Sequence, residues 1–445
     1  MSKYLLKNCK IVNEDEIFNS DIFIQDGRIE KIDRDISVKS ACIEINGEGL
    51  HLLPGAIDDQ VHFREPGLTH KGEIYTEAKA AVAGGITSYM EMPNTVPSAT
   101  TPEKLEQKYT RAKEVSLANY SFYVGTTNHN LEELLKVNYK NVCGVKIFMG
   151  SSTGDMLVDD PVALENIFSK VDALIATHCE YDPLVKENAE RIKMEYGEDI
   201  PPYFHPVIRN EEACYKSSKF ASDLARKYNT RLHILHISTA KELELFTNKI
   251  PLKEKRITAE ACIHHLWFSD EDYKSKGNYI KWNPAVKTAY DREAILNAVV
   301  NDTIDVIATD HAPHTREEKE QTYFKAPSGG PLVQHSLIAM LDLYHRGKIS
   351  LEKITRKMSH NVADMFSIQE RGFIREGYFA DLVLVNLNKS TTVKKENLLY
   401  KCGWSPFEGH TFLSSIEKTF INGHLVFDNG KFNEEHKGMR MQFNR

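Results

Sequence analysis

The chain has 445 residues, of which 41% are hydrophobic and 27% are charged, and its formal net charge at pH 7 is -7. These values are typical of a globular protein and exclude a fibrous or disordered chain. The negative charge and the absence of basic runs argue against a nucleic-acid partner. No stretch reaches the roughly 18 consecutive apolar residues of a membrane span. We therefore expect a small-molecule substrate, and neither a nucleic acid nor a membrane as partner.

The cysteines and the start of the chain indicate where the protein works. The seven cysteines are an odd number at irregular spacing, with no Cys-x-x-Cys pair, which indicates reduced thiols rather than a disulfide framework. The first residues, MSKYLLKNCKIVNEDE, lack the apolar core of a signal peptide. We expect a cytoplasmic protein.

Both ends of the chain have the pattern of antiparallel strands, with short β-rich runs separated by turns. Dipeptides that favour tight turns mark the separations: Asp26-Gly27, Asn46-Gly47, Asn422-Gly423 and Asn429-Gly430. We predict that residues 1–53 and 366–445 together form one small β-sandwich domain.

Between these ends, short apolar strands alternate with segments of helical composition, the pattern of parallel βαβ units. Eight strands are predicted, at residues 52–62, 87–93, 120–126, 144–150, 173–179, 232–238, 257–265 and 305–312. Eight such units predict an α/β fold with a closed, TIM-like (β/α)8 barrel, which we place at residues 54–365. The longest irregular stretches are expected at 180–210 and 313–331.

Polar side chains stand near the carboxyl-terminal ends of seven of these strands. In chain order they are Gln60, His62, Arg64, Asn94, Lys146, His178, His236, His264 and Asp310. Barrel enzymes carry their chemistry on this rim, so we expect these residues to converge on one site. Imidazoles and a carboxylate from four strand ends, His62, His178, His236 and Asp310, predict a catalytic zinc site with open coordination positions.

The alternation of side chains along a strand assigns some of the neighbouring residues. Gln60, His62 and Arg64 share one face, so two of them can contact a metal and the third a substrate. His233 and His236 are an odd number of residues apart, so we expect His236 in the site and His233 packed beneath a helix. His264 and His265 are adjacent, so we expect them to point to opposite faces as well, and which of the two serves the site stays open.

Lys146 is unusual because an ammonium group within the run VKIFM is unfavourable to bury without a partner. One explanation is an ion pair with Asp310 or Asp58. The other is a functional role, which requires a chemical change of the amine, since a cation does not bind a metal.

Four strings resemble the dihydroorotases of the amidohydrolase superfamily: PGAIDDQVHFREPG, EMPNTVP, GVKIFMG and ATDHAPHT. The resemblance covers nearly the whole chain, since REGYFADLVLV and INGHLVFDNGKF resemble the segments that close the β domain in these hydrolases. It implies a zinc-dependent cyclic amidohydrolase that interconverts N-carbamoyl-L-aspartate and L-dihydroorotate in de novo pyrimidine biosynthesis, with one or two zinc ions per chain.

The resemblance also implies roles for single residues. It implies that Lys146 is N6-carboxylated and bridges two ions, that His178 and His236 bind one zinc, and that His62 and Asp310 bind the other. The substrate-binding residues that it implies are Arg64, Asn94, Asn283, His314, Ser328 and Gly329.

The chain departs from the family at one metal ligand. The family has His-x-His where this chain has Gln60-Val61-His62, and an amide oxygen is a poorer zinc ligand than imidazole. We therefore expect Gln60 to leave that metal position weakened, completed by water, or empty.

The expected mechanism assigns separate roles to the metal, to Asp310 and to Arg64. Zinc lowers the pKa of bound water from 15.7 to about 7 and polarises the substrate carbonyl. Asp310 is the expected catalytic proton shuttle between that water and the leaving nitrogen. The guanidinium of Arg64 matches a substrate carboxylate, which dihydroorotate has.

Two alternatives stay open. The chain could be another cyclic amidohydrolase, of the dihydropyrimidinase, hydantoinase or allantoinase type, and Arg64 argues against this. It could also be a catalytically silent dihydroorotase-like subunit that supports aspartate transcarbamoylase, for which Gln60 is the only sign. We expect a homo-oligomer, a dimer or tetramer, and leave an association with aspartate transcarbamoylase open.

Overall fold

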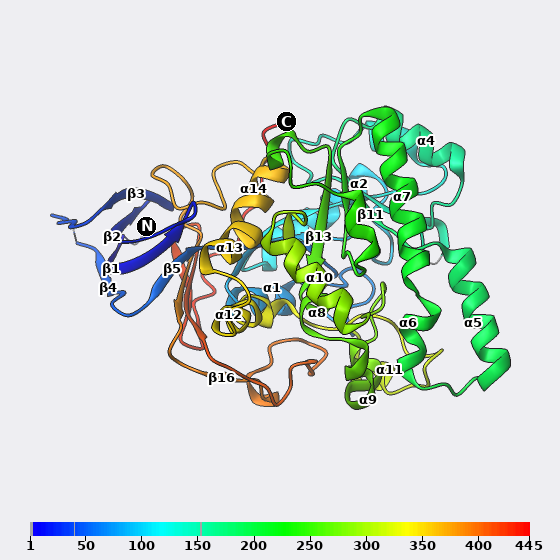
Figure 1. The fold of residues 1–445 in the computed structure, drawn as a ribbon. Helices are drawn as coiled ribbons and strands as arrows, with labels where there is room; N and C mark the ends of the chain where they lie inside the picture. Colours follow the sequence, from blue (N-terminus) through cyan, green and yellow to red (C-terminus); the bar gives the residue numbers. More distant parts are fainter. Residues whose placement is uncertain (1–2, 40, 152–153) are drawn as a thin grey trace.

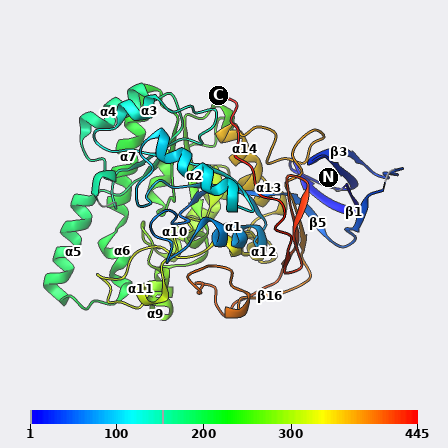
Figure 2. The same cartoon turned by 180° about the vertical axis from the view of Figure 1, so that it is seen from behind.

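The computed structural model describes residues 3–39, 41–151 and 154–445. It has two parts, a β-rich part that contains both the first and the last strands, and a larger barrel wrapped by helices (Figure 1). The same division is visible from behind (Figure 2).

Nine strands of the described residues form the sheet of the β-rich part, in the order β20-β19-β18-β15-β5-β1-β2-β3 with β4 beside β1. The amino-terminal strand β5 pairs antiparallel with the carboxyl-terminal strand β15, which joins the two ends of the chain. The strands are β1 (Tyr4–Asn13), β2 (Glu16–Gln25), β3 (Arg28–Asp33), β4 (Ile43–Asn46), β5 (His51–Pro54), β15 (Leu382–Asn386), β18 (Ser415–Ile421), β19 (His424–Asp428) and β20 (Lys431–Phe432).

This sheet folds back on itself into two layers. Tyr4 of β1 and Phe420 of β18 lie three strand steps apart, about 14 Å in a flat sheet, yet their ring centroids are 5.3 Å apart. The turns at Gly27 and Gly423 also meet, since a Cβ on Gly423 would lie 2.6 Å from the Cα of Gly27. The predicted β-sandwich built from both chain ends is confirmed, while its boundaries after residues 53 and 365 stay a prediction.

The barrel contains eight parallel strands within the described residues. It is closed between β6 and β14 by a hydrogen bond of 2.7 Å from the His62 amide to the His311 carbonyl. Tyr123 separates β8 from β9, which together form the third strand. The strands are β6 (Ala56–Val61), β7 (Ile86–Glu91), β8 (Asn119–Phe122), β9 (Val124–Gly125), β10 (Val145–Phe148), β11 (Ile175–His178), β12 (Leu232–Ile234), β13 (Ile257–Cys262) and β14 (Val306–Ala308).

Each predicted barrel segment contains or overlaps one of these strands, so the (β/α)8 barrel is confirmed. Two segments differ in extent. The segment 52–62 is divided at Gly55, because its first residues pair in the β-sandwich as β5. The segment 257–265 ends early, because helix α8 begins at Ile263.

Helices cover the outside of the barrel (Figures 1 and 2). They are α1 (Ile74–Ala83), α2 (Pro102–Val115), α3 (Leu131–Leu135), α4 (Pro161–Lys170), α5 (Asp182–Tyr196), α6 (His205–Ile208), α7 (Glu211–Tyr228), α8 (Ile263–Trp267), α9 (Tyr273–Lys276), α10 (Ala289–Val300), α11 (Arg316–Lys319), α12 (Ser336–His345), α13 (Leu351–Thr355) and α14 (Asn361–Phe366). None of the helices in the described part of the chain has the length and apolar composition needed to cross a bilayer.

The prediction that residues 180–210 are irregular is wrong, because α5 occupies residues 182–196. A proline in its first turn favours helix initiation, and Gly197 ends it with φ 85°. The described remainder includes a two-stranded ribbon of β16 (Thr391–Thr392) and β17 (Thr411–Phe412), and a π-helical turn, Arg356–His360, that links α13 to α14.

Candidate active site

The carboxyl-terminal ends of the barrel strands bring four of the predicted metal ligands together as two pairs. The Nδ1 atom of His178 lies 3.0 Å from the Nε2 atom of His236. The Nε2 atom of His62 lies 3.2 Å from the Oδ1 atom of Asp310. All four side chains are buried, so each pair sits in an environment that excludes most water.

The ring of His233 packs against a helix residue, Phe366 of α14, with centroids 6.2 Å apart, but the prediction that it faces away from the barrel interior is wrong. Its Nε2 atom lies 3.2 Å from the Oδ2 atom of Asp59, which belongs to β6 on another part of the ring, so His233 points into the barrel as His236 does. The alternation rule fails here because β12 ends at Ile234 and His236 has a left-handed backbone, with φ 40°.

Glu180 holds His178 in one orientation. Its Oε2 atom lies 3.0 Å from Nε2 of His178 and also accepts hydrogen bonds from Ser151 at 2.7 Å and Arg209 at 2.6 Å. Burial raises the pKa of Glu180, but Arg209 and His178 outweigh it and hold the pKa well below its usual range. A carboxylate that keeps the proton on Nε2 leaves the Nδ1 lone pair directed at His236, the arrangement common behind metal-binding histidines.

His62 is held in a similar way by Asn94. The two side chains are joined by a hydrogen bond of 2.7 Å between Nδ1 of His62 and Oδ1 of Asn94. Because the amide oxygen can only accept, Nδ1 donates, and Nε2 faces Asp310 with its lone pair. The predicted contact of Asn94 with substrate stays a prediction.

Gln60 reaches the same carboxylate. Its Nε2 atom donates to Oδ1 of Asp310 at 3.0 Å, while its Oε1 atom lies 3.7 Å from the sulfur of Cys262. Only the amide oxygen of Gln60 could bind a metal, and in this orientation that oxygen faces the thiol. Gln60 therefore supports Asp310 here, and its role as a metal ligand stays a prediction.

Lys146 of β10 is fully buried, and its Nζ atom has no hydrogen-bond partner within the part of the chain that the structure describes. The nitrogen lies 4.6 Å from the centre of the Phe148 ring. Among the described residues it forms no ion pair, so the suggested bridge to Asp310 or Asp58 is not found. Burial lowers the pKa of Lys146 to about 8, against the opposing effect of Asp310 and Glu260.

The residues at this rim fit a bound metal. Two nitrogens, Nζ of Lys146 and Nδ1 of His236, are buried without a partner. The separations of 3.0 Å and 3.2 Å within the two pairs match neighbouring ligands of one ion, since bonds of about 2.1 Å place such atoms about 3.0 to 3.4 Å apart. Imidazole with carboxylate is a donor set that suits zinc.

Arg64 lies beside this group and is held by contacts other than an ion pair. Its Nε atom donates to the Pro313 carbonyl at 3.0 Å, and its Nη2 atom lies 3.1 Å from Nε2 of His314. Within the described residues its guanidinium makes no ion pair with a carboxylate. Burial lowers the pKa of Arg64 to about 10, which still leaves it charged at neutral pH.

His314 connects Arg64 to the loop that carries Ser328 and Gly329. Its Nε2 atom lies 3.0 Å from the Ser328 carbonyl oxygen, and its Nδ1 atom lies 3.0 Å from Nζ of Lys71. Burial and the neighbouring Arg64 hold the pKa of His314 well below its usual range. The structure thus brings Arg64, His314 and Ser328 together, as the resemblance implied.

Gly329 is required by its position. Its φ is 128°, and a Cβ atom there would lie 2.5 Å from the carbonyl oxygen of Ala312. Both the backbone angle and the close approach favour glycine at this point of the loop.

Two buried lysines, which the sequence did not indicate, donate hydrogen bonds to backbone carbonyls of the loop that carries Ser328 and Gly329. Lys319 donates to the carbonyls of Pro327 at 2.9 Å and Gly329 at 2.8 Å, and Lys281 donates to Ala326 at 2.5 Å. Burial lowers the pKa of Lys281 to about 7. No motif marks these lysines, because their partners are backbone atoms of a loop.

Asn283 and the histidine pair of α8 complete the group. The Oδ1 atom of Asn283 is buried without a partner. The ring of His264 stacks on Trp282 with centroids 4.4 Å apart, and neither of its nitrogens has a partner. His265 is bound to the backbone instead, with Nε2 3.1 Å from the Pro284 carbonyl oxygen. Nδ1 of His265 has no hydrogen-bond partner among the described residues either, so which of the two histidines serves the site stays open.

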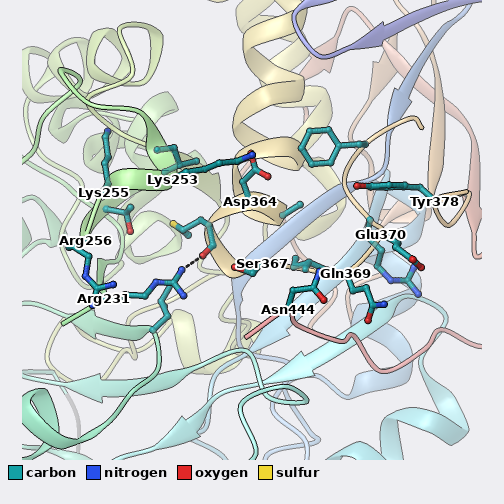
Figure 3. A pocket seen from close by; sticks show the side chains of 18 of the residues that line it. Arg231, Lys253, Lys255, Arg256, Asp364, Ser367, Gln369, Glu370, Tyr378 and Asn444 are labelled. Atoms are coloured by element: carbon teal, nitrogen blue, oxygen red, sulfur yellow. Dashed lines mark hydrogen bonds and ion pairs between the residues drawn. The ribbon is translucent and has the colours of Figure 1, made fainter. Parts of the chain in front are cut away.

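A separate cavity of about 700 Å³ lies near the starts of β12 and β13, away from this rim, and none of the predicted site residues lines it. Figure 3 shows basic side chains around it, among them Arg231, which donates to the carbonyl of Met365. Most of its charges are matched within the protein, for example Lys255 by Asp305. We assign the chemistry to the rim, not to this cavity.

Known proteins resemble the chain over most of its length. The family model described as "Amidohydrolase family" matches residues 51–426. The dihydroorotase of Methanosarcina acetivorans is 32% identical over 415 residues, 91% of this chain and 88% of its own. The allantoinase of Desulfitobacterium hafniense is 30% identical over 441 residues, 97% of each.

A solved structure shares the fold. The L-hydantoinase (dihydropyrimidinase) from Arthrobacter aurescens has a TM-score of 0.92 and 25% sequence identity, and the match covers 99% of this chain and 100% of that chain. Together with the barrel and its rim of imidazoles and carboxylates, these matches establish that the chain belongs to the amidohydrolase family.

Proposed function

We propose that this cyclic amidohydrolase is a dihydroorotase, which interconverts N-carbamoyl-L-aspartate and L-dihydroorotate in de novo pyrimidine biosynthesis. The observation that carries the proposal is Arg64, a buried guanidinium beside the rim with no carboxylate partner among the described residues. A buried unpaired charge is unfavourable, and a substrate carboxylate would neutralise it. Hydantoin and allantoin have no such group. The relatives named dihydroorotase support the same substrate.

We further propose one or two zinc ions at the rim. His178 and His236 would hold one ion, and His62 and Asp310 the other, with Gln60 or water completing the second. Lys146 would be N6-carboxylated and would bridge the two, which turns an unpartnered buried cation into an anionic ligand. When bound, the metal supplies hydroxide at neutral pH and polarises the substrate carbonyl.

Asp310 would carry the proton. In the hydrolytic direction the water oxygen bonds to a ring carbonyl carbon and the adjacent ring C–N bond breaks. The Asp310 carboxylate accepts the proton of the water and passes it to the departing nitrogen. Gln60, which donates to Oδ1 at 3.0 Å, would fix the carboxylate between the two proton positions. Ring closure runs through the same steps in reverse.

The substrate would be held by Arg64 at its carboxylate, with His314 and the Pro313 carbonyl fixing the guanidinium. The remaining contacts would come from Asn94, Asn283, Ser328 and Gly329. The unpartnered Oδ1 of Asn283 is an acceptor suited to a ring N–H.

The test is to assay the purified protein for both directions of the reaction, with allantoin and hydantoin as comparison substrates and with zinc counted by elemental analysis. We expect turnover of carbamoyl-aspartate and dihydroorotate and zinc in the protein. Turnover of allantoin or hydantoin without dihydroorotate would assign the chain to a sister activity. Neither turnover nor zinc would favour the silent subunit.

We also propose that the protein is located in the cytoplasm. We propose that it forms a homo-oligomer, a dimer or tetramer. All seven cysteines lie within the described residues, and none is disulfide-bonded, which fits a reducing compartment. Light scattering on the purified protein tests the oligomeric state. Co-purification with aspartate transcarbamoylase tests the association left open by the sequence.

A further inference from the structure

A second group of potential metal ligands lies inside the barrel, and it contains none of the residues assigned to the rim. It consists of Asp59 of β6, His233 of β12 and Glu260 of β13, all with 0% exposure. In the ring, β14 lies between β6 and β13, so Asp59 reaches the other two across the barrel interior. One ligand atom of each residue lies within 4.8 Å of the others.

The hydrogen bonds of His233 define which of its nitrogens faces the carboxylates. The hydroxyl of Thr258 donates to the Leu232 carbonyl at 3.2 Å, so it accepts from Nδ1 of His233, 2.9 Å away. Burial lowers the pKa of His233, but Asp59 and Glu260 outweigh it and raise the pKa to about 9, so Nε2 carries a proton when no metal is bound. In the neutral ring, the form that binds a metal, Nε2 presents a lone pair. That lone pair lies 3.2 Å from Oδ2 of Asp59 and 3.7 Å from Oε2 of Glu260.

Among the described residues, no hydrogen bond satisfies the carboxylate oxygens that face His233, although Nε2 of His233 lies within ion-pair distance of both. Both oxygens of Asp59 and the Oε2 atom of Glu260 have no hydrogen-bond partner, and neither has Nε2 of His233. The other oxygen of Glu260 is satisfied, because it accepts from the His236 amide at 2.9 Å and the Cys262 thiol at 3.2 Å. Buried carboxylates without donors are strongly unfavourable unless a cation compensates them. The protonated ring of His233 supplies one positive charge to the two carboxylates, whereas a divalent ion would supply two, one for each carboxylate.

The separations also fit a shared ion. Metal bonds of about 2.1 Å place two ligand atoms about 3.0 Å apart at a right angle and about 3.6 Å apart at 120°. The distances from Nε2 of His233, 3.2 Å and 3.7 Å, lie close to that range. One imidazole with two carboxylates favours a divalent transition metal over the all-oxygen sites of magnesium and calcium.

We propose that Asp59, His233 and Glu260 bind one divalent transition-metal ion, zinc or manganese, in the barrel interior, separate from the ions proposed at the rim. The ion would link three strands that also carry rim residues. Asp59 precedes Gln60 in β6, and Glu260 holds the amide of His236. It would therefore position the rim without touching substrate.

The first test is diffraction from crystals of the whole protein grown with zinc or with manganese. An anomalous difference map should show a peak bonded to all three side chains, in addition to any peaks at the rim. Peaks at the rim alone, with Asp59 and His233 hydrogen-bonded directly, would overturn the proposal. This test needs no substitution.

The second test counts metal in variants by elemental analysis after dialysis. Asp59→Asn should lose one ion per chain relative to the unmodified protein. Asp58→Asn is the matched control, since Asp58 is a buried neighbour in the same strand that is satisfied by the Thr309 hydroxyl at 2.6 Å. An unchanged metal count in folded Asp59→Asn would overturn the proposal. If this variant does not fold, the diffraction test decides.

Metal binding at the rim and metal binding in the barrel interior can be distinguished by experiment. His178→Asn should lose metal from the rim and keep the interior peak. Conversely, an interior ion in a protein without dihydroorotase activity would refute the proposed function and leave the interior site standing.

Discussion

Replacing Arg64 by lysine tests the basis of substrate selection. In the structure Nε of Arg64 is bound to the Pro313 carbonyl, and Nη2 lies beside His314. These contacts hold the guanidinium in place, and its remaining N–H groups are available to bind the substrate carboxylate. Two charge-assisted hydrogen bonds to a carboxylate contribute about 1.5 to 3 kcal/mol each. Lysine keeps one such bond at most. The loss of the other predicts a fall in kcat/KM of roughly 10- to 150-fold for carbamoyl-aspartate.

The assay is steady-state ring closure and ring opening, with KM and kcat determined separately for Arg64→Lys. Arg226→Lys is the matched control, since Arg226 is exposed on α7 and pairs with Asp223 on the same helix; its kinetics should be unchanged. Near-normal kcat/KM of Arg64→Lys for carbamoyl-aspartate would refute the assignment of Arg64 to the substrate carboxylate.

Three further predictions concern the support of the site and the stability of the fold. Glu180→Gln should weaken zinc binding by about 10- to 100-fold, because the amide no longer fixes the proton of His178; chelator competition measures this, and unchanged affinity would contradict it. Gly329→Ala should raise KM and cost about 1 to 3 kcal/mol, because its Cβ would lie 2.5 Å from the Ala312 carbonyl oxygen; KM and urea unfolding check both effects, and wild-type values would disprove the steric argument. Burial lowers the pKa of His360 from 6.5 to about 4. The unfolded chain therefore binds the proton more tightly than the folded protein. As the pH falls from 6.5 to 4, this difference lowers the free energy of unfolding by about 3 kcal/mol. Urea unfolding at pH 7 and pH 4.5 should show a smaller loss for His360→Gln, and an equal loss would exclude this origin.

The barrel could be predicted because its signals are local. Each strand is a short apolar run, and strands that alternate with helices form a parallel sheet. The gathering of His62, His178, His236 and Asp310 at one rim then follows from the rule that parallel strands present their carboxyl ends on the same side of the barrel, whereas their division into two pairs was implied by the resemblance to the dihydroorotases. No knowledge of distant contacts is needed for these inferences.

The alternation rule failed where the backbone leaves the strand conformation. His236 has φ 40°, so the odd spacing from His233 does not place the two rings on opposite sides. A left-handed histidine has no signature in the sequence. A different limit hid the group of Asp59, His233 and Glu260, because Asp59 reaches the other two across the barrel from the non-adjacent strand β6.

The supports of the site were also beyond sequence reasoning. Arg209 reaches Glu180 from the loop after α6, and Lys319 binds the carbonyls of Pro327 and Gly329. Such contacts depend on how loops fold over the rim, which periodicity does not describe. Only Glu180 had a local sign, since it follows His178 by two residues at the end of β11.

The junction at Gly55 has a consequence for how the chain folds while the ribosome synthesises it. It joins β5 directly to the first barrel strand, and β5 pairs with β15, so that Leu53 lies opposite Val383. On the ribosome β5 emerges early, while its partner emerges only when most of the chain has been made. The exposed edge of β5 must stay unpaired throughout that interval, a period in which nascent chains are prone to aggregate. Premature termination before residue 382 would leave that edge permanently open, and such fragments should depend on chaperones or be degraded.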